Sequence, residues 1–336
     1  MNRLLESWDY LDTTHQRFYI TGSETPTVVS GGRRGTLACS ADTEQGYGAY
    51  IVATSGNELI CGAAVAWPTA SGLGNIFAFG DPTASGYVNV FITALDDGSI
   101  VIYRYPDTLL ALSPAGVLAF GAGYQYIEAR VGIASGVSGI AEVRVNGQPV
   151  ITLSAVNTFY AGSLTPTLVF IYPQGRRIYD DLFINDAMGG VNDSFEGDVR
   201  IDTHYPDADG AHSEWNRLSG AIQFEMIDEH PPDEDTTYNF TTTSGNLDTV
   251  SVQTLIPVFA GIRAVSLIAR ARKVPPGNAG LAPIIRFNSV DYEGTGYTLG
   301  SGYAYHETNY DTHPATASGW SDSDFNSSEF GYKKVQ

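Results

Sequence analysis

Cysteine is scarce in this chain: Cys39 and Cys61 are the only two among 336 residues. Two cysteines in a chain of this length do not make a disulfide framework, and no Cys–His spacing typical of a zinc site accompanies them. Each lies in an apolar stretch, so we interpret both as small buried side chains, with a cross-strand contact as one arrangement. The sequence leaves open whether the two form a disulfide bond.

Cations are also scarce, with 18 Lys and Arg against 37 Asp and Glu and a formal net charge of −19. Such a chain is repelled by phosphate backbones unless its bases gather on one face. The densest basic group is Arg263, Arg270, Arg272 and Lys273, which the alternation of a strand would scatter. We therefore predict no nucleic-acid partner. One interpretation of the negative charge is that it keeps the protein soluble. The alternative is that some of the carboxylates form loops that bind cations.

Long apolar segments are absent from the sequence. The first ten residues have no apolar core and carry Glu6, unlike a signal peptide, and no run approaches the roughly 20 apolar residues that span a bilayer. The sequence therefore predicts no membrane insertion, and it predicts synthesis and folding in a cytoplasm.

The residues that are abundant belong to strands and tight turns. The chain has 37 Gly, 20 Tyr and 15 Phe, and no block of helix-forming residues keeps a helical period for three turns. Two apolar runs flank the turn Asp96-Asp97-Gly98, and a second pair flanks Asn146-Gly147; both are hairpin signatures. Around the second hairpin, Glu128, Arg130, Glu142 and Arg144 share one face, which indicates a sheet with one wet side. We predict an all-β fold.

A break at Ala187-Met188-Gly189-Gly190 divides the chain into two predicted domains, 1–187 and 188–336. The first reads as a β-sandwich or jelly roll of about ten strands. The second reads as another β domain, whose last turn of helix begins at a Ser321 cap with Asp324 three residues on. The segment Ile262–Arg272 also fits a short helix, although we favour a strand. Predicted strands of the second domain are Gly197–His204, Asp248–Leu255, Ile262–Arg272, Leu281–Phe287, Gly302–Tyr310 and Phe330–Val335.

The run Arg176–Asp186, with Asp180-Asp181-Leu182, resembles the closing strand of the concanavalin A-like (laminin-G-like) jelly roll. The hairpin from Tyr126-Ile127-Glu128 to Asn146-Gly147 and the turn Gly31–Gly35 resemble other parts of that fold. The chain departs from the pattern where Tyr124 and Tyr126 stand in place of a Trp. In the second half, segments resemble a module of structural proteins of tailed bacteriophages; they are Phe195–Ile201, Tyr205–Ala211 with Trp215, Ile227–Tyr238, Ala269–Lys273 and Ser328–Tyr332.

This resemblance implies a concanavalin A-like jelly roll followed by a second β-sandwich-type domain. It also implies a non-catalytic virion protein, assembled in the host cytoplasm as a tail-fibre, tail-tip or capsid-surface component. Its partners would be other virion proteins and a host surface glycan, and virion symmetry favours a homo-oligomer such as a trimer. By analogy with the fold, binding would use the concave sheet face or the rim loops Asp81–Gly86 and Asp107–Gly116.

Two acidic segments are candidates for binding a cation. Asp207-Ala208-Asp209-Gly210, with Glu214 beyond it, resembles part of a calcium loop, although a full loop needs more oxygens at fixed spacing; an acidic turn is the simpler interpretation. Asp228–Asp235 holds five carboxylates around two prolines, where mutual repulsion favours a cation or a basic partner unless water screens it.

The alternative function is a glycan-binding lectin module or a polysaccharide depolymerase. Asp180 and Asp181 are adjacent on a predicted strand, so their side chains should point to opposite faces and fail as a glycosidase pair. We expect Trp67, Trp215 and Trp320 to pack in the core rather than stack on sugars. No nucleophile elbow or phosphate loop is present, so we predict no catalytic residue, no cofactor and no enzyme activity. The histidines lie apart without metal-ligand spacing: His15, His204, His212, His230, His306 and His313.

Overall fold

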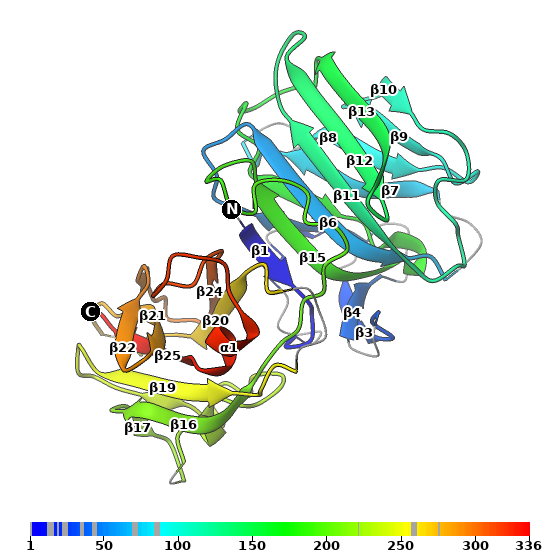
Figure 1. Cartoon of the computed structure of the whole chain (residues 1–336). Helices are drawn as coiled ribbons and strands as arrows, with labels where there is room; N and C mark the ends of the chain where they lie inside the picture. Colours follow the sequence, from blue (N-terminus) through cyan, green and yellow to red (C-terminus); the bar gives the residue numbers. More distant parts are fainter. Residues whose placement is uncertain are drawn as a thin grey trace. The chain divides into compact units, whose positions relative to one another are not determined.

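The computed structural model describes residues 2–11, 17–18, 20–21, 26–33, 37–41, 46–68, 73–83, 88–220, 222–256, 261–274 and 276–336. The chain is almost entirely β and divides into two compact units, Met1–Asp202 and Thr203–Gln336 (Figure 1). The predicted all-β fold is confirmed. No helix among the described residues is long and apolar enough to cross a membrane.

The first unit is a jelly-roll sandwich, and one of its two sheets, sheet A, has the strand order β13-β12-β11-β6-β15-β4-β3, with β1 paired to β15. All pairs are antiparallel, and three of the nine-residue strands, β6, β11 and β15, lie side by side at the centre. The strands are β1 (Asn2–Glu6), β3 (Thr27–Ser30), β4 (Leu37–Ser40), β6 (Glu58–Ala66), β11 (Tyr124–Gly132), β12 (Gly139–Val145), β13 (Gln148–Val156) and β15 (Ile178–Asp186).

The other sheet of the first unit, sheet B, has the order β10-β9-β8-β7-β14-β5-β2. Its first four strands form a meander, and β14 returns between β7 and β5. The strands are β2 (Ile20–Thr21), β5 (Gly48–Ile51), β7 (Gly74–Gly80), β8 (Val88–Ala94), β9 (Ile100–Arg104), β10 (Thr108–Leu112) and β14 (Leu168–Ile171).

The two predicted hairpins are confirmed. Strands β8 and β9 pair from Val90–Arg104 to Ala94–Ile100, and Gly98 in the turn has φ +76°. Strands β12 and β13 are joined by Asn146 and Gly147, both with positive φ, as the favoured two-residue turn requires. Local turn chemistry therefore sets the register of both hairpins.

The boundary between the units lies later than the predicted break at residue 187. Residues 188–202 belong to the first unit because Phe195 and Val199 pack on a buried cluster of sheet A that includes Tyr126 and Phe183. The predicted strand Gly197–His204 does not form; residues 197–205 have no regular secondary structure. This segment covers the side of sheet A that carries Glu128, so that side is not exposed to solvent there and Glu128 is fully buried.

The second unit contains a sheet of order β16-β19-β25-β21-β22, with β23 on β21, and two separate strand pairs. The pair β20–β24 packs on this sheet through a core that includes Val265, Ile285 and Phe330. Residues 265–271 are a strand, and helix α1 (Asp322–Asn326) begins at the predicted Ser321–Asp324 capping box. Remaining strands are β16 (Pro206–Ser213), β17 (Asn216–Arg217), β18 (Asn239–Phe240), β19 (Leu247–Val252), β20 (Val265–Ala271), β21 (Gly280–Phe287), β22 (Val290–Glu293), β23 (Tyr297–Thr298), β24 (Ala304–Tyr310) and β25 (Glu329–Lys334).

Cys39 and Cys61 are both buried and both free. Their predicted burial is confirmed, but they are not cross-strand neighbours. Cys39 lies on β4 and Cys61 on β6, and β15 runs between these strands. Burial raises the pKa of both thiols well above the ordinary value, so they are held as neutral thiols.

Candidate functional site: the outward face of sheet B

Sheet B has one face turned toward sheet A and one turned away from it. The ring of Phe77 on β7 lies 6.1 Å from that of Tyr179 on β15, so Phe77 faces sheet A. Successive side chains of a strand point to opposite faces, which turns Ala78 away from sheet A. The register places Phe91 and Phe170 opposite Ala78, and Tyr103 opposite Phe91. We call this side the outward face of sheet B.

Aromatic rings form a continuous series on and beside the outward face. We call them the aromatic stripe: Tyr47, Phe91, Tyr105, Tyr160, Phe170 and Tyr172. Successive ring centroids lie 4.7 Å apart for Tyr105–Tyr160, 6.2 Å for Phe91–Tyr105, 6.5 Å for Phe91–Tyr172 and 5.7 Å for Tyr47–Tyr172.

Exposure varies along the aromatic stripe. Tyr160 is 44% exposed, Phe91, Tyr105 and Tyr47 are half-buried, and Tyr172 is buried beneath the series. The buried rings pack with Ala49, Ala78 and Leu168, whose small or aliphatic side chains leave room for them on the sheet. A buried layer therefore supports rings that still present surface to solvent.

One buried side chain positions the end of the stripe. Asn89 is fully buried, its Oδ1 accepts the backbone N–H groups of Tyr160 (2.6 Å) and Ala161 (3.1 Å), and its Nδ2 donates to the oxygen of Ala161 (3.2 Å). The backbone oxygen of Asn89 also accepts the N–H of Tyr105 at 2.9 Å. Two segments far apart in the chain are thereby fixed to β8, and their rings meet.

Asp81 holds the neighbouring rim loop. Its carboxylate accepts hydrogen bonds from Thr83 N (2.9 Å), from Thr83 Oγ1 (2.8 Å) and from the N–H of Ser163. Burial would raise the pKa of Asp81, but these hydrogen bonds outweigh it and lower the pKa. The predicted rim loop 81–86 is described only as far as residue 83; residues 84–86 lie outside the described part.

Polar groups on the outward face are uncharged. Thr93 on β8 pairs with Asn75 on β7, and its hydroxyl donates to Asn75 Oδ1 at 2.7 Å. The Thr93–Asn75 pair is directly bonded and lies along the same strands as Phe91 and Ala78. The face thus combines aromatic surface with hydroxyl and amide groups, a composition that fits a polyhydroxylated ligand.

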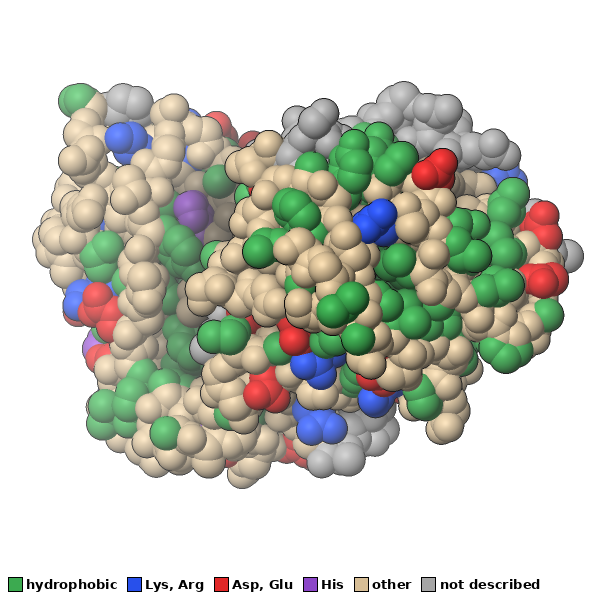
Figure 2. All heavy atoms as spheres, turned by 90° about the horizontal axis from the view of Figure 1, so that it is seen from above, with side chains coloured by type: hydrophobic (Ala, Val, Ile, Leu, Met, Phe, Trp, Pro, Cys, Tyr) green, Lys and Arg blue, Asp and Glu red, His purple; other side chains and the backbone are tan. Residues whose placement is uncertain are grey.

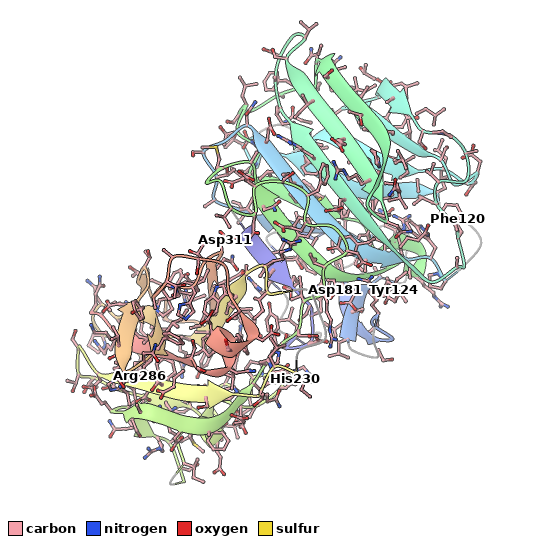
Figure 3. All side chains as sticks on the ribbon, viewed as in Figure 1. Phe120, Tyr124, Asp181, His230, Arg286 and Asp311 are labelled. Carbon is pink, nitrogen blue, oxygen red and sulfur yellow. The ribbon has the colours of Figure 1, made fainter. Side chains whose placement is uncertain are left out.

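Asp180 and Asp181 do not point to opposite faces, which corrects the sequence prediction. A β-bulge interrupts the pairing of β15 with β6 between Asp180 and Phe183, and Asp181 has φ +51°. Both carboxylates therefore reach Arg33: Asp180 Oδ2 accepts its N–H at 2.7 Å, and Asp181 Oδ2 its Nη1 at 3.3 Å. Figure 3 shows Asp181 beside Tyr124 at one end of the first unit.

Arg33 joins these carboxylates to the segment that covers sheet A. It forms an ion pair with Asp198 and donates to the oxygen of Val199 at 3.2 Å, while Asp181 Oδ1 accepts Ile201 N–H at 2.8 Å. Burial, and then the neighbouring Asp181, raises the pKa of Asp180 to about 7. Both carboxylates are nearly inaccessible, so we interpret the group as an internal clamp rather than a substrate site.

The predicted calcium segment 207–210 is part of strand β16 and not a loop. Asp209 Oδ1 accepts the backbone N–H groups of Gln223 (2.9 Å) and Phe224 (2.8 Å), which begin a short 3-10 helix. Across the described ranges of the chain, no group of three or more His, Cys, Asp or Glu side chains is arranged to hold a metal ion.

Two carboxylates of the acidic segment 228–235 form ion pairs with two arginines of the basic segment 270–273. Glu234 Oε1 accepts Arg270 Nε at 2.9 Å, and Asp235 Oδ1 accepts Arg272 Nη2 at 2.7 Å. Both arginines also lie over the ring of Tyr303. The chain's own arginines therefore relieve the mutual repulsion of the carboxylates at Glu234 and Asp235.

The tryptophans that sequence analysis assigned to packing do pack against other side chains. The ring centroid of Trp67 lies 5.4 Å from that of Phe120, that of Trp215 lies 4.9 Å from Tyr332, and that of Trp320 lies 4.5 Å from His313. The described histidines are scattered over the second unit, and His15 lies outside the described residues, as do Arg34 and Gly35 of the Gly31–Gly35 turn.

Sequence analysis missed the aromatic stripe. Alternation in the β8–β9 hairpin does place Phe91 and Tyr103 on one face, which is a usable signal. Alternation along the predicted strand 165–172 likewise places Phe170 and Tyr172 on one face. Tyr160 lies in a segment without such a pattern, and its meeting with Tyr105 depends on sheet order and on Asn89.

No family model matches the sequence, and no curated protein matches it. Several solved structures are similar. A mutant of alginate lyase Aly36B, in complex with an alginate tetrasaccharide, is 16% identical, with a TM-score of 0.38, and the match covers 55% of this chain and 96% of that one.

Two further structures show the range of similar proteins. The endo-β-1,4-glucuronan lyase of the fungus Trichoderma reesei is 14% identical, with a TM-score of 0.34, covering 55% of this chain and 95% of that one. Sheep galectin-11 is 10% identical, with a TM-score of 0.29, covering 44% of this chain and all of that one. These likenesses concern the jelly-roll fold.

The presence of lyases among the similar structures corrects one expectation. The sequence predicted that this chain has no enzyme activity, and the polysaccharide lyases among the similar structures contradict that prediction. At these identities the likeness assigns no activity and no catalytic residue to this chain. The virion setting stays a prediction.

Proposed function

We propose that the first unit binds saccharide chains on the outward face of sheet B. The observation that carries the proposal is the aromatic stripe, with four ring-to-ring steps of 4.7–6.5 Å and with Tyr160, Tyr105, Phe91 and Tyr47 open to solvent in part. The stripe is longer than one sugar ring, so it fits an oligosaccharide or polysaccharide rather than a monosaccharide.

The chemistry of the face supports this ligand. The C–H faces of sugar rings are apolar and pack on aromatic rings, which bring a large contact area at a small cost in side-chain entropy. Sugar hydroxyl groups require donors and acceptors nearby, and Thr93 and Asn75 provide both on the same face. The proposal depends on these contacts and not on the likeness to lyases or to a galectin.

The test is binding of the full chain to a panel of polysaccharides and oligosaccharides, measured by calorimetry or by retardation in polysaccharide-containing gels. The double variant Tyr105→Ala/Tyr160→Ala should lose affinity by about fivefold or more, because each aromatic contact contributes roughly 0.5–1.5 kcal/mol. Release of shortened products, followed in the same samples, distinguishes turnover from binding.

The matched control is Phe240→Ala, since Phe240 is a 43% exposed aromatic residue of the second unit, close to the 44% of Tyr160. It should leave saccharide affinity unchanged. Absence of binding by the wild-type chain, or equal affinity of the double variant and the wild type, would overturn the proposal.

The virion role inferred from the resemblance is compatible with this proposal, because a saccharide site on a tail or capsid-surface protein would serve adhesion to a host surface glycan. Fixed copy number in purified particles, together with a trimer or other homo-oligomer in solution, is the result that this role predicts. A monomer that is absent from particles would contradict it.

A further inference from the structure

The charge of the outward face narrows the class of saccharide, and this inference rests on the proposed saccharide site. The seven strands of sheet B contain a single charged residue, Arg104 at the end of β9. Tyr103 points to the outward face, so Arg104 points to the opposite one, and its Nη2 donates to Thr108 at 3.2 Å. In the described strands, the outward face therefore carries no charged side chain.

Two arginines lie in the described loop that follows Tyr172. Arg176 is exposed and belongs to the 3-10 turn Gln174–Arg176 rather than to a strand of sheet B. Arg177 is 2% exposed, and its guanidinium donates to the backbone oxygens of Tyr172 and Asn75. Asp107, in the turn between β9 and β10, is exposed and negative, and Asp81 is buried in its own hydrogen bonds. Figure 2, which views the molecule from above and does not single out sheet B, shows charged side chains in small groups among hydrophobic and uncharged ones.

We infer that the saccharide bound here is uncharged, and that uronate and sialylated chains are excluded. A carboxylate laid on the aromatic stripe loses water and finds no cation on the outward face of the described strands of sheet B, which is costly. The chain's net charge of −19 repels a polyanion as it approaches. A hydroxymethyl group in place of the carboxylate meets neither obstacle, so the face discriminates mainly by rejecting charge.

The test uses pairs of polymers that share a backbone and differ only at the oxidised carbon: β-1,4-glucan and β-1,4-glucuronan, β-1,4-mannan and β-1,4-mannuronan, and α-1,4-galactan and α-1,4-galacturonan. Affinity of the full chain is measured for both members of each pair, at low and at physiological salt. We expect at least one neutral polymer to bind, its acidic partner to bind at least about tenfold more weakly, and the neutral affinity to change little with salt.

The outcomes separate this inference from the function on which it rests. Equal or tighter binding of an acidic member overturns the inference and leaves the saccharide site standing. Binding of none of the six polymers overturns the proposed function itself.

A gain of binding provides a second measurement. Leu109 on β10 is paired with Tyr103 and is 57% exposed, so Leu109→Lys places a cation at the edge of the outward face without disturbing the core. We expect it to raise affinity for the acidic polymers severalfold, and this gain should disappear at high salt. Val290→Lys makes the same change of charge at a 50% exposed position of the second unit and should produce no gain. A gain in both variants would show that net charge, rather than this face, controls rejection.

Discussion

Tyr105 and Tyr160 lie with their ring centroids 4.7 Å apart, and the backbone N–H groups of both are bonded to Asn89. One fully buried residue therefore connects β8 to the end of β9 through its backbone oxygen and to the loop that follows β13 through its side chain. The exposed end of the aromatic stripe is built on this connection.

Replacement of Asn89 tests whether this connection holds the site. Asn89→Leu leaves the N–H groups of Tyr160 and Ala161 without their acceptor inside the protein. We expect the free energy of unfolding to fall by about 1–3 kcal/mol, and saccharide affinity to fall while the protein remains folded. Urea denaturation and binding at a temperature well below the melting transition measure the two effects. An unchanged affinity would show that the loop does not position the rings.

The buried carboxyl of Asp180 makes the first unit sensitive to pH. Its pKa of about 7 in the folded state exceeds the ordinary value of 3.8, so between these values the folded protein holds a proton that the unfolded chain has lost. Its contribution to stability is therefore full below about pH 4 and declines as the pH rises toward 7.

Asp180→Asn keeps an acceptor for Arg33 N–H and removes the charge. We expect it to stabilise the first unit by about 1–2 kcal/mol at about pH 8, and to have little effect at about pH 4. Urea denaturation at the two pH values checks this. Destabilisation by the same amount at both values would contradict it and would show that the carboxylate form is needed.

His313 gives the second unit the opposite dependence. The ring is fully buried between Phe287 and Trp320, and its Nδ1 accepts Ala315 N–H at 3.2 Å. Burial lowers its pKa below the ordinary 6.5, although Asp324 opposes this shift; Ser328 Oγ, at 3.5 Å, is the other polar group that faces the ring.

The unfolded chain therefore binds a proton near pH 6 that the folded unit resists. Stability of the second unit should fall as the pH falls below about 6.5. His313→Phe should flatten this dependence, although the Ala315 N–H then lacks its acceptor. Hydrogen exchange of peptides that cover residues 313–330, at several pH values, measures how the stability of the second unit depends on pH. A wild-type unit that is equally protected at pH 5 and pH 7.5 would contradict the prediction.

The two thiols should be inert in the folded protein. Cys39 and Cys61 are fully buried with raised pKa values, and a thiol reagent attacks the exposed thiolate. We expect no labelling of the native chain and labelling of both thiols after denaturation without reductant. Labelling of neither thiol in the denatured chain would indicate a disulfide bond, which the separation of β4 and β6 by β15 excludes.

Sequence reasoning succeeded where the determining contacts are local. The Asn146-Gly147 turn, the β8–β9 hairpin and the Ser321 cap depend on residues within a few positions of one another. Alternation correctly placed Glu128 and Arg144 on one face. It did not predict the segment that covers this face, because the Phe195 ring, whose centroid lies 3.9 Å from Cζ of Arg144, reaches it only after the chain has returned to sheet A.

The failures have two physical causes. The prediction that Asp180 and Asp181 point to opposite faces assumed a regular strand. The positive φ at Asp181 and the bulge in β15 instead bring both carboxylates to Arg33. The charged segments around Glu234 and Arg270 were weighed separately, whereas the fold of the second unit pairs them. Neither the bulge nor the pairing follows from the residues closest in sequence.

The most direct test of the account is where a bound saccharide protects the chain. Hydrogen exchange of the full chain, with and without a neutral oligosaccharide that binds, should show added protection in peptides from residues 88–105, 157–163 and 168–172, which contain five of the six rings of the aromatic stripe. Protection confined to the second unit, or to the covered side of sheet A around Glu128, would contradict a saccharide site on the outward face of sheet B.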